Sequence, residues 1–245
     1  MALQALLWDV DGTLAETERD GHRPAFNRAF SEAGLPLHWD DATYGRWLEI
    51  AGGRERITAA LCHLEESPPD PQRVEALQAS KQRHYAALMA DGDLQLRAGV
   101  RELILQARAQ GLRQVIVTTS SRSAVQALVD RLLPDIASAF SFWVCGEDVS
   151  RKKPDPQAYG LAADQLDLPR HQLLAIEDSP AGLAAAAGAG LACVITRSHY
   201  GLSTSLSAFA PARAVLSGLG PGARVLRGPA CTAAGITLSY LEALL

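Results

Sequence analysis

Short apolar runs separated by helical segments constrain the fold of this chain more than any other feature. Segments of helical character lie between most of the runs, at 100–110, 123–133, 156–166 and 180–187. Strands that alternate with helices are joined by right-handed crossovers, so we expect an α/β fold with a Rossmann-like parallel sheet covered on both faces. The runs typical of buried strands are 3–8, 114–117, 140–144, 173–176 and 192–195.

Residues 16–91 interrupt this alternation. They contain no convincing strand but four helix-like segments, at 18–33, 39–49, 54–65 and 73–89. The breaks between these segments are rich in glycine or proline, as in the stretch SPPDP. We therefore expect residues 16–91 to form a helical insert, and residues 1–15 and 92–245 to form the α/β core.

Composition excludes several classes of protein. The 245 residues are 48% apolar and 20% charged, the balance of a globular chain. A net charge of −4 provides no overall attraction to nucleic acid or to an anionic membrane, so we expect neither as a partner. No apolar run is long enough to cross a bilayer, and the N-terminus lacks the features of a secretion signal. Four scattered cysteines without metal spacing predict reduced thiols in a cytoplasmic protein.

Polar side chains follow several of the predicted strands at one edge of the sheet. In open parallel sheets, ligands bind beyond the carboxyl ends of the strands. Carboxylates that converge there with a single lysine need a metal ion, and oxygen-only ligands favour Mg²⁺. The residues concerned are Asp9 and Asp11 after the first run, Thr118–Ser121 after the second, Lys153 after the third, and Glu177 and Asp178 after the fourth.

Motifs at these strand ends resemble those of the haloacid dehalogenase (HAD) superfamily. The stretches DVDGT, KPDP and EDSPAG, together with the hydroxyl-bearing end of the second strand, occur in the order and approximate spacing of that superfamily. The helical insert stands where a cap domain follows the first motif. The resemblance covers nearly the whole chain and implies a HAD fold with a cap at residues 16–91.

Three other stretches are similar to the CbbY-like branch of this superfamily. They are AETERDGHRPAFNRAF, YGRWLEIAGGRERIT and VITRSHYG. Characterised members of that branch dephosphorylate xylulose 1,5-bisphosphate, a misfire product that inhibits Rubisco. The resemblance therefore implies a phosphatase for a phosphorylated sugar, and we expect the enzyme to act as a monomer.

The resemblance also implies a role for each residue at the strand ends. Asp9 would attack phosphorus and form an aspartyl phosphate, while Asp11 would protonate the departing oxygen and later take a proton from water. Their pKa values must then be pushed apart, with Asp11 protonated and Asp9 ionised. Lys153 would bridge nucleophile and phosphate. The ligands of Mg²⁺ would be Asp9, the Asp11 carbonyl and Asp178, with Glu177 binding through water or orienting Asp178.

Hydroxyl groups and amides after the second strand would bind the transferring phosphate. By resemblance, Thr119 hydrogen-bonds a phosphate oxygen, and amides near Ser120, Ser121 and Arg122 assist at a helix N-terminus. A shift of one residue at the strand end would place Thr118 there instead, and the sequence leaves both open.

The cap is expected to select the substrate, because the second phosphate of a bisphosphate needs cations away from the metal. Arg56 follows a cap glycine by three positions, as in related sugar phosphate enzymes. Arg54 and Arg56 are also interpretable as solvated helix charges, and Lys81 as a surface residue. The candidates carried over from cap positions are Glu18, His22, Tyr44, Gly52, Gly53, Arg54, Arg56 and Lys81.

Other functions stay open on the sequence. A sugar phosphomutase of the β-phosphoglucomutase type shares the acids and the cap, although Thr13 favours a phosphatase because related mutases carry an apolar residue there. A phosphatase for another small ester, such as phosphoglycolate, is a further candidate. A non-catalytic module is disfavoured because all the expected acids are present.

Overall fold

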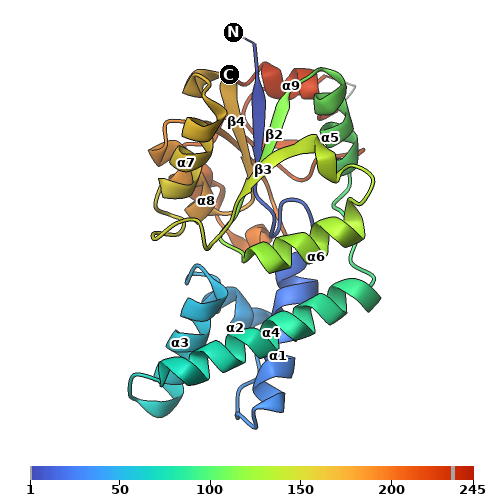
Figure 1. Cartoon of the computed structure of the whole chain (residues 1–245). Coiled ribbons are helices and arrows are strands. Elements are labelled where there is room, and N and C mark those ends of the chain that lie inside the picture. Colours follow the sequence, from blue (N-terminus) through green and yellow to red (C-terminus); the bar gives the residue numbers. More distant parts are fainter. Residues whose placement is uncertain (1, 233–234) are drawn as a thin grey trace.

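A single sheet organises the α/β part of the molecule. The computed structural model describes residues 2–232 and 235–245, and within them a seven-stranded sheet has the order β3-β2-β1-β4-β5-β6-β7 (Figure 1). The strands are β1 (Ala5–Trp8), β2 (Arg113–Val117), β3 (Phe140–Val144), β4 (Leu173–Glu177), β5 (Ala192–Thr196), β6 (Ala214–Leu216) and β7 (Val225–Arg227). All neighbours pair in parallel except β6 and β7, which are antiparallel.

The predicted parallel sheet is confirmed, and each of the five predicted runs overlaps a strand. The structure adds β6 and β7, which are not among the strands expected from the sequence. Each has only three residues, and β7 lies in the glycine- and proline-rich region near the C-terminus, so neither presents a long apolar run.

Helices cover both faces of the sheet, as predicted, because side chains of the central strands alternate between two apolar clusters. In β1, Leu6 and Trp8 face one cluster and Ala5 and Leu7 the other. Helices α5 (Val100–Ala109), α6 (Arg122–Leu132) and α9 (Leu238–Glu242) pack on the first face, and α7 (Gln157–Leu166) and α8 (Pro180–Gly188) on the second. No helix among the described residues combines the length and apolarity needed to span a bilayer.

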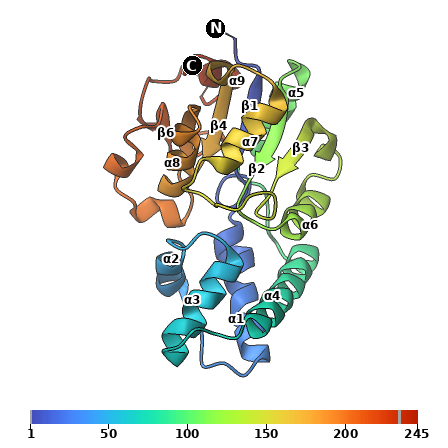
Figure 2. The same cartoon turned by 60° about the vertical axis from the view of Figure 1, so that its left-hand side comes forward.

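The insert between β1 and α5 is helical and lies beyond the carboxyl ends of the strands (Figures 1 and 2). We call residues 16–91 the cap, and its separation from the core at these boundaries stays a prediction. Its own core contains Phe26, Phe30, Trp39 and Tyr44. The cap elements are a π-helical turn (Glu18–His22), α1 (Arg23–Glu32), α2 (Asp41–Trp47), α3 (Gly53–Glu65) and α4 (Pro71–Asp91).

Polar contacts join the cap to the core across the seam between them, and α4 packs against α6. Gln82 of α4 donates to Ser121 at 2.5 Å, and Lys152 pairs with Glu55 at 2.6 Å. A third contact joins Asp41 of the cap to the core, as His199 lies 2.8 Å and the Tyr200 hydroxyl 2.9 Å from its carboxylate.

The order of the strands fixes the position of the site. The chain leaves β1 to one side to form β2 and β3, then crosses to the other side to form β4. The carboxyl ends of β1 and β4 therefore flank a topological switch point, where open α/β sheets bind ligands. Asp9 and Asp178 follow these two strands directly.

Candidate active site

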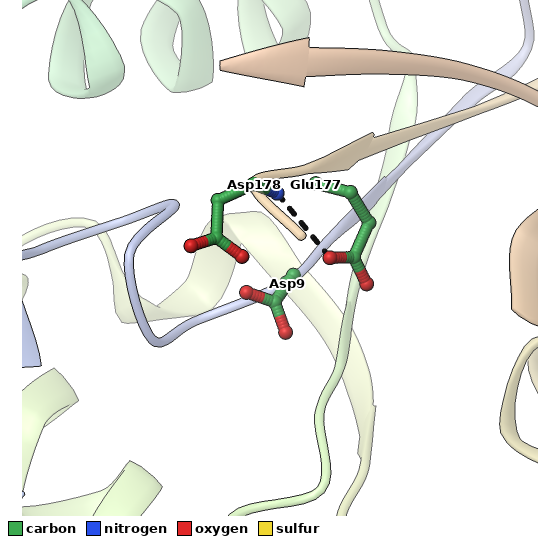
Figure 3. A group of neighbouring side chains, drawn as sticks. All are labelled: Asp9, Glu177 and Asp178. Atoms are coloured by element: carbon green, nitrogen blue, oxygen red, sulfur yellow. Dashed lines mark hydrogen bonds between the residues drawn. The ribbon is translucent and has the colours of Figure 1, made fainter. Parts of the chain in front are cut away.

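Three carboxylates meet at the switch point. One oxygen from each of Asp9, Glu177 and Asp178 lies within 4.8 Å of the other two (Figure 3). In Figure 3 the carboxylates of Asp9 and Asp178 lie close together, while Glu177 lies to one side and accepts from the amide of Asp178 at 3.3 Å. The predicted convergence of these acids is therefore present.

Burial and mutual repulsion change how readily these acids ionise. Burial, followed by the charge of Glu177, raises the pKa of Asp9 to about 8, although Lys153 acts in the opposite direction. Burial and the charges of Asp9 and Glu177 likewise raise the pKa of Asp178 well above its ordinary range. The cluster is thus short of positive charge.

Lys153 supplies the one cation that contacts this cluster among the described residues. Its ammonium donates to Asp9 at 2.8 Å, to Glu177 at 2.5 Å and to the carbonyl of Val117 at 2.8 Å. The side chain is buried, which alone would lower its pKa, but the charges of Asp9 and Glu177 outweigh burial and raise the pKa of Lys153 above its ordinary range. Tyr159 donates to the same Glu177 oxygen at 2.7 Å, so lysine and tyrosine together fix that carboxylate.

The donor set fits a divalent cation. Three acids against one lysine leave a shortage of positive charge, and every candidate ligand atom is an oxygen, as Mg²⁺ prefers. Ser198 donates to Asp178 at 2.5 Å and orients it. Gly12 closes the other side, because with φ at +84° and the Asp178 carboxylate against it, a Cβ at this position would overlap that carboxylate.

The side chain of Asp11 turns away from this cluster toward the cap. It accepts from Thr17 and Ser120 at 2.5 Å each and from the His22 Nε2 at 2.9 Å. Burial would raise the pKa of Asp11, but the charge of His22 and these hydrogen bonds hold the pKa well below its ordinary range. In the protein without metal or substrate, the pKa of Asp9 is thus raised and that of Asp11 lowered. Catalysis is expected to need the opposite order, with Asp11 protonated and Asp9 ionised.

A buried chain of contacts connects Asp11 to the cap. Lys81 lies 2.8 Å from His22 Nδ1, and His22 Nε2 faces Asp11. Burial lowers the pKa of Lys81 to about 8, so its proton is held more loosely than that of an ordinary lysine.

The two threonines after β2 have different surroundings. Thr118 is 1% exposed, and its hydroxyl accepts from the amide of Ser120 at 3.1 Å. Thr119 lines the cavity beside Ser120 and Ser121. Of the two, Thr119 is thus the one that lines the cavity, and its contact with phosphate stays a prediction.

The N-terminus of α6 is largely occupied by protein groups. The Arg122 amide donates to the Glu147 carboxylate at 3.1 Å, and the Arg122 guanidinium donates to Asp148 at 2.6 Å. Ser121 caps the helix by accepting from the amide of Ala124 at 3.3 Å. A phosphate at these amides would have to displace Glu147, so the role expected for Arg122 stays a prediction.

Arg56 and Glu18 form a buried hub inside the cap. The guanidinium donates to Glu18 at 3.2 Å, to the Tyr44 hydroxyl at 3.0 Å and to the carbonyl of Ile50 at 2.8 Å. The Tyr44 hydroxyl also donates to Glu18. The two charged side chains are only 8% and 16% exposed, so removing one of them would cost about 3–5 kcal/mol.

Two other cations of the cavity have weaker partners. Arg54 pairs with Glu75 at 2.6 Å, and both side chains are more than half exposed. Lys152 pairs with Glu55 at 2.6 Å, with the two side chains 22% and 43% exposed. The exposed Arg54–Glu75 pair contributes about 0–1 kcal/mol, and the Lys152–Glu55 pair is partly exposed, so neither is held as firmly as the buried Arg56–Glu18 pair.

A cavity of about 450 Å³ lies between cap and core and contains most of the predicted substrate residues. Tyr44 and Arg122 are the two predicted residues that do not line it. Its predicted lining residues are Glu18, His22, Gly52, Gly53, Arg54, Arg56, Lys81, Thr119, Ser120 and Ser121.

Comparison with known families identifies the family to which this chain belongs. The family model described as haloacid dehalogenase-like hydrolase matches residues 3–190. The chain belongs to this family of hydrolases. The resemblance drawn from the sequence motifs is therefore confirmed, and the CbbY relatives confirm its narrower branch, so that this HAD-like chain is an enzyme of the phosphatase type.

Relatives of this HAD-like chain cover most of its length. Protein CbbY of Cereibacter sphaeroides is 40% identical over 199 residues, which are 81% of this chain and 86% of that protein. Protein CbbY of Rhodobacter capsulatus is 42% identical over 209 residues, or 85% and 91% of the two chains.

Solved structures agree with the sequence relatives. A crystal structure of mutant CbbY from Rhodobacter sphaeroides with xylulose-(1,5)-bisphosphate has a TM-score of 0.83 at 37% identity and covers 96% of this chain and all of that one. A β-phosphoglucomutase from Clostridium difficile has a TM-score of 0.76 at 16% identity over 99% and 96% of the two chains, which shows the shared fold alone.

Several residues of this HAD-like site are absent from the sequence-based candidates. Thr17 contacts Asp11, Ser198 contacts Asp178, and Tyr159 contacts Glu177. Lys152 and Glu55 line the cavity. Ser198 belongs to the stretch VITRSHYG, which offered a signal, whereas Tyr159 and Glu55 lie inside helices whose orientation the sequence does not give.

Proposed function

We propose that this HAD-like enzyme is a Mg²⁺-dependent sugar phosphate phosphatase that removes a phosphate from xylulose 1,5-bisphosphate through an aspartyl phosphate. The observation that carries the proposal is the cluster of Asp9, Glu177, Asp178 and Lys153 beside a cap cavity. The CbbY structure with that bisphosphate, which is similar over 96% of this chain, supports the choice of substrate.

In the proposed reaction, a carboxylate oxygen of Asp9 attacks phosphorus while the ester P–O bond breaks. Asp11 gives its proton to the departing sugar oxygen, then takes a proton from the water that cleaves the aspartyl phosphate and releases phosphate. Lys153 holds Asp9 in place and stabilises the phosphoryl charge. Asp11 must gain its proton before transfer, and a phosphate dianion near it would raise its pKa in that direction.

Mg²⁺ would be held by the carboxylates of Asp9 and Asp178 and the carbonyl of Asp11. When bound, it would neutralise the excess acid charge and draw electrons from the phosphoryl oxygens. Glu177 already accepts hydrogen bonds from Lys153 and Tyr159. We therefore infer that Glu177 orients the Lys153 side chain, in addition to any contact with the metal ion through water.

A panel of phosphate esters tests the substrate. We expect the highest kcat/KM for xylulose 1,5-bisphosphate, ahead of ribulose 1,5-bisphosphate, β-glucose 1-phosphate and phosphoglycolate. A preferred monophosphate would show that the cationic cap has been misinterpreted. Conversion of β-glucose 1-phosphate without release of phosphate would identify a mutase instead. A cytoplasmic location and a monomeric state stay predictions from the sequence.

A further inference from the structure

Lys152 and Glu55 form an ion pair across the seam between core and cap. Lys152 lies in the loop after β3, next to Lys153, and Glu55 lies in the first turn of α3. Their charged atoms are 2.6 Å apart, and both residues line the cavity. Gly52 has φ at +97°, and a Cβ there would overlap both the Glu55 carboxylate and the Lys152 ammonium. The pair therefore packs directly against the backbone of Gly52, which has no side chain.

Fewer of the hydrogen-bond donors of Lys152 are used by protein groups than is the case for the buried Arg56. The donors of Arg56 are used by Ile50, Tyr44 and Glu18. Lys81 contacts His22, which in turn faces Asp11. The contact with Glu55 is the one hydrogen bond of the Lys152 ammonium among the described residues, and an ammonium has three donors.

The surroundings of Lys152 also favour an anion. The amides at the start of α3, a helix of 13 residues, have no acceptor within the helix and carry partial positive charge. Glu55 partly neutralises this end of the helix and Lys152 together. One of its carboxylate oxygens is buried without a hydrogen-bond partner among the described residues. A carboxylate with a hydrogen bond to only one of its two oxygens is held weakly at this position, so an incoming anion can replace it.

We propose that Lys152 binds the phosphate that is not cleaved, and that Glu55 holds the Lys152 ammonium at this position until the substrate replaces it. The proposal rests on the proposed function, since it requires a substrate with two phosphates. Glu55 is 43% exposed, so its carboxylate can turn toward water when the phosphate arrives. Lys152 would then select bisphosphates over monophosphates without taking part in the chemistry at Asp9.

Substitution of Lys152 tests this inference with two substrates. Lys152→Ala should lower kcat/KM for xylulose 1,5-bisphosphate about 10- to 100-fold, mainly through KM, because a charge-assisted contact to phosphate is lost. The loss for p-nitrophenyl phosphate, which has no second phosphate, should be at least tenfold smaller. Lys152→Arg should retain most of the selectivity. Arg151→Ala is the matched control, because Arg151 adjoins Lys152 but pairs with Asp155 on the surface, and it should change neither substrate.

Glu55→Gln tests the exchange of partners. Removal of the competing charge should lower KM for the bisphosphate several-fold and leave KM for p-nitrophenyl phosphate unchanged. The inference is overturned if Lys152→Ala affects both substrates equally or neither, or if Glu55→Gln leaves KM for the bisphosphate unchanged. These results differ from failure of the proposed function, in which the unmodified enzyme itself would not cleave xylulose 1,5-bisphosphate, and which would overturn both.

Discussion

Gly12 shows how one residue adapts the backbone to the site. Its positive φ suits glycine, and its position against Asp178 leaves no room for a side chain. Gly34 has a similar φ of +66°, but no atom lies within 4 Å of the place that a methyl group would take there. A comparison of the two positions therefore separates backbone strain from contact with the site.

Gly12→Ala should damage the metal site, whereas Gly34→Ala should only strain the backbone. Both changes place alanine at positive φ, which costs about 1–2 kcal/mol. Gly12→Ala should in addition displace Asp178 and raise the Mg²⁺ concentration for half-maximal activity at least tenfold. Mg²⁺ titrations of phosphate release, beside thermal unfolding of both variants, measure the two effects. Equal Mg²⁺ requirements in the two variants would contradict this role of Gly12.

The strand ends explain which site residues the sequence predicts. Asp9 and Asp178 adjoin apolar runs, so their meeting at one edge follows from the parallel sheet. Tyr159 reaches Glu177, and Ser198 reaches Asp178, only through the packing of α7 and the loop after β5, which a linear pattern does not specify. The direction of the Asp11 side chain is likewise set by contacts with Thr17 and His22 of the cap and with Ser120 after β2.

At the scale of elements, the hub of Arg56, Glu18 and Tyr44 connects three cap segments: the π-helical turn, α2 and α3. The sequence motifs predict substrate binding for all three residues, and the structure shows that their polar groups already satisfy one another. Their role in holding the cap together is therefore at least as direct as contact with a phosphate.

Arg56→Met and Arg54→Met should have very different effects on stability. Arg56→Met leaves Glu18 buried without its cation, and we expect a loss of about 3–5 kcal/mol in the free energy of unfolding. Arg54→Met breaks an exposed pair and should cost about 1 kcal/mol or less. Denaturant unfolding of both proteins measures the difference. A small loss for Arg56→Met, with selective damage to bisphosphate turnover, would show that its main role is in substrate binding.

Asp41 holds the cap helix α2 to the core through His199 and Tyr200. Asp41→Ala should raise KM several-fold, because the cap closes less readily over the substrate, and should speed hydrogen exchange in the loop after β5. The neighbouring Asp40→Ala is the control. Asp40 caps α2 by accepting from the amide of Thr43 at 2.7 Å, so its loss should cost about 1 kcal/mol of stability without raising KM. Equal KM values in both variants would exclude this role for Asp41.

At the scale of the whole molecule, the fold follows from the sequence pattern more completely than the seam does. Alternation of apolar runs and helices predicts the sheet and its two covered faces. The contacts of Gln82, Lys152 and Asp41 across the seam join segments that are far apart in the sequence and carry no shared motif. Such pairs depend on how the cap sits on the core, and no local pattern encodes that.

The pKa of Asp9 predicts a pH-dependent response of the whole protein to Mg²⁺. Its pKa is raised from 3.8 to about 8, so the folded metal-free protein binds more protons than the unfolded chain between these values. This contribution to stability is therefore lost as the pH rises through that window. Mg²⁺ requires the ionised carboxylate and must displace the proton below about pH 8.

We therefore expect Mg²⁺ to raise the Tm more at pH 8 than at pH 6. Thermal unfolding with Mg²⁺ and with EDTA at both pH values measures this difference. Asp9→Asn, which has no ionisable group at this position, should weaken the pH dependence. An equal Mg²⁺-induced shift at pH 6 and pH 8 in the unmodified protein would show that Asp9 is already ionised in the free site.

The most direct test of the proposed mechanism is phosphate release from xylulose 1,5-bisphosphate by the unmodified enzyme and by Asp9→Asn, each with Mg²⁺ and with EDTA. We predict release by the unmodified enzyme with Mg²⁺, and a loss of at least a thousandfold on chelation or on substitution of Asp9. Release by Asp9→Asn at the unmodified rate would contradict the central claim that Asp9 is the nucleophile of a cation-dependent phosphatase.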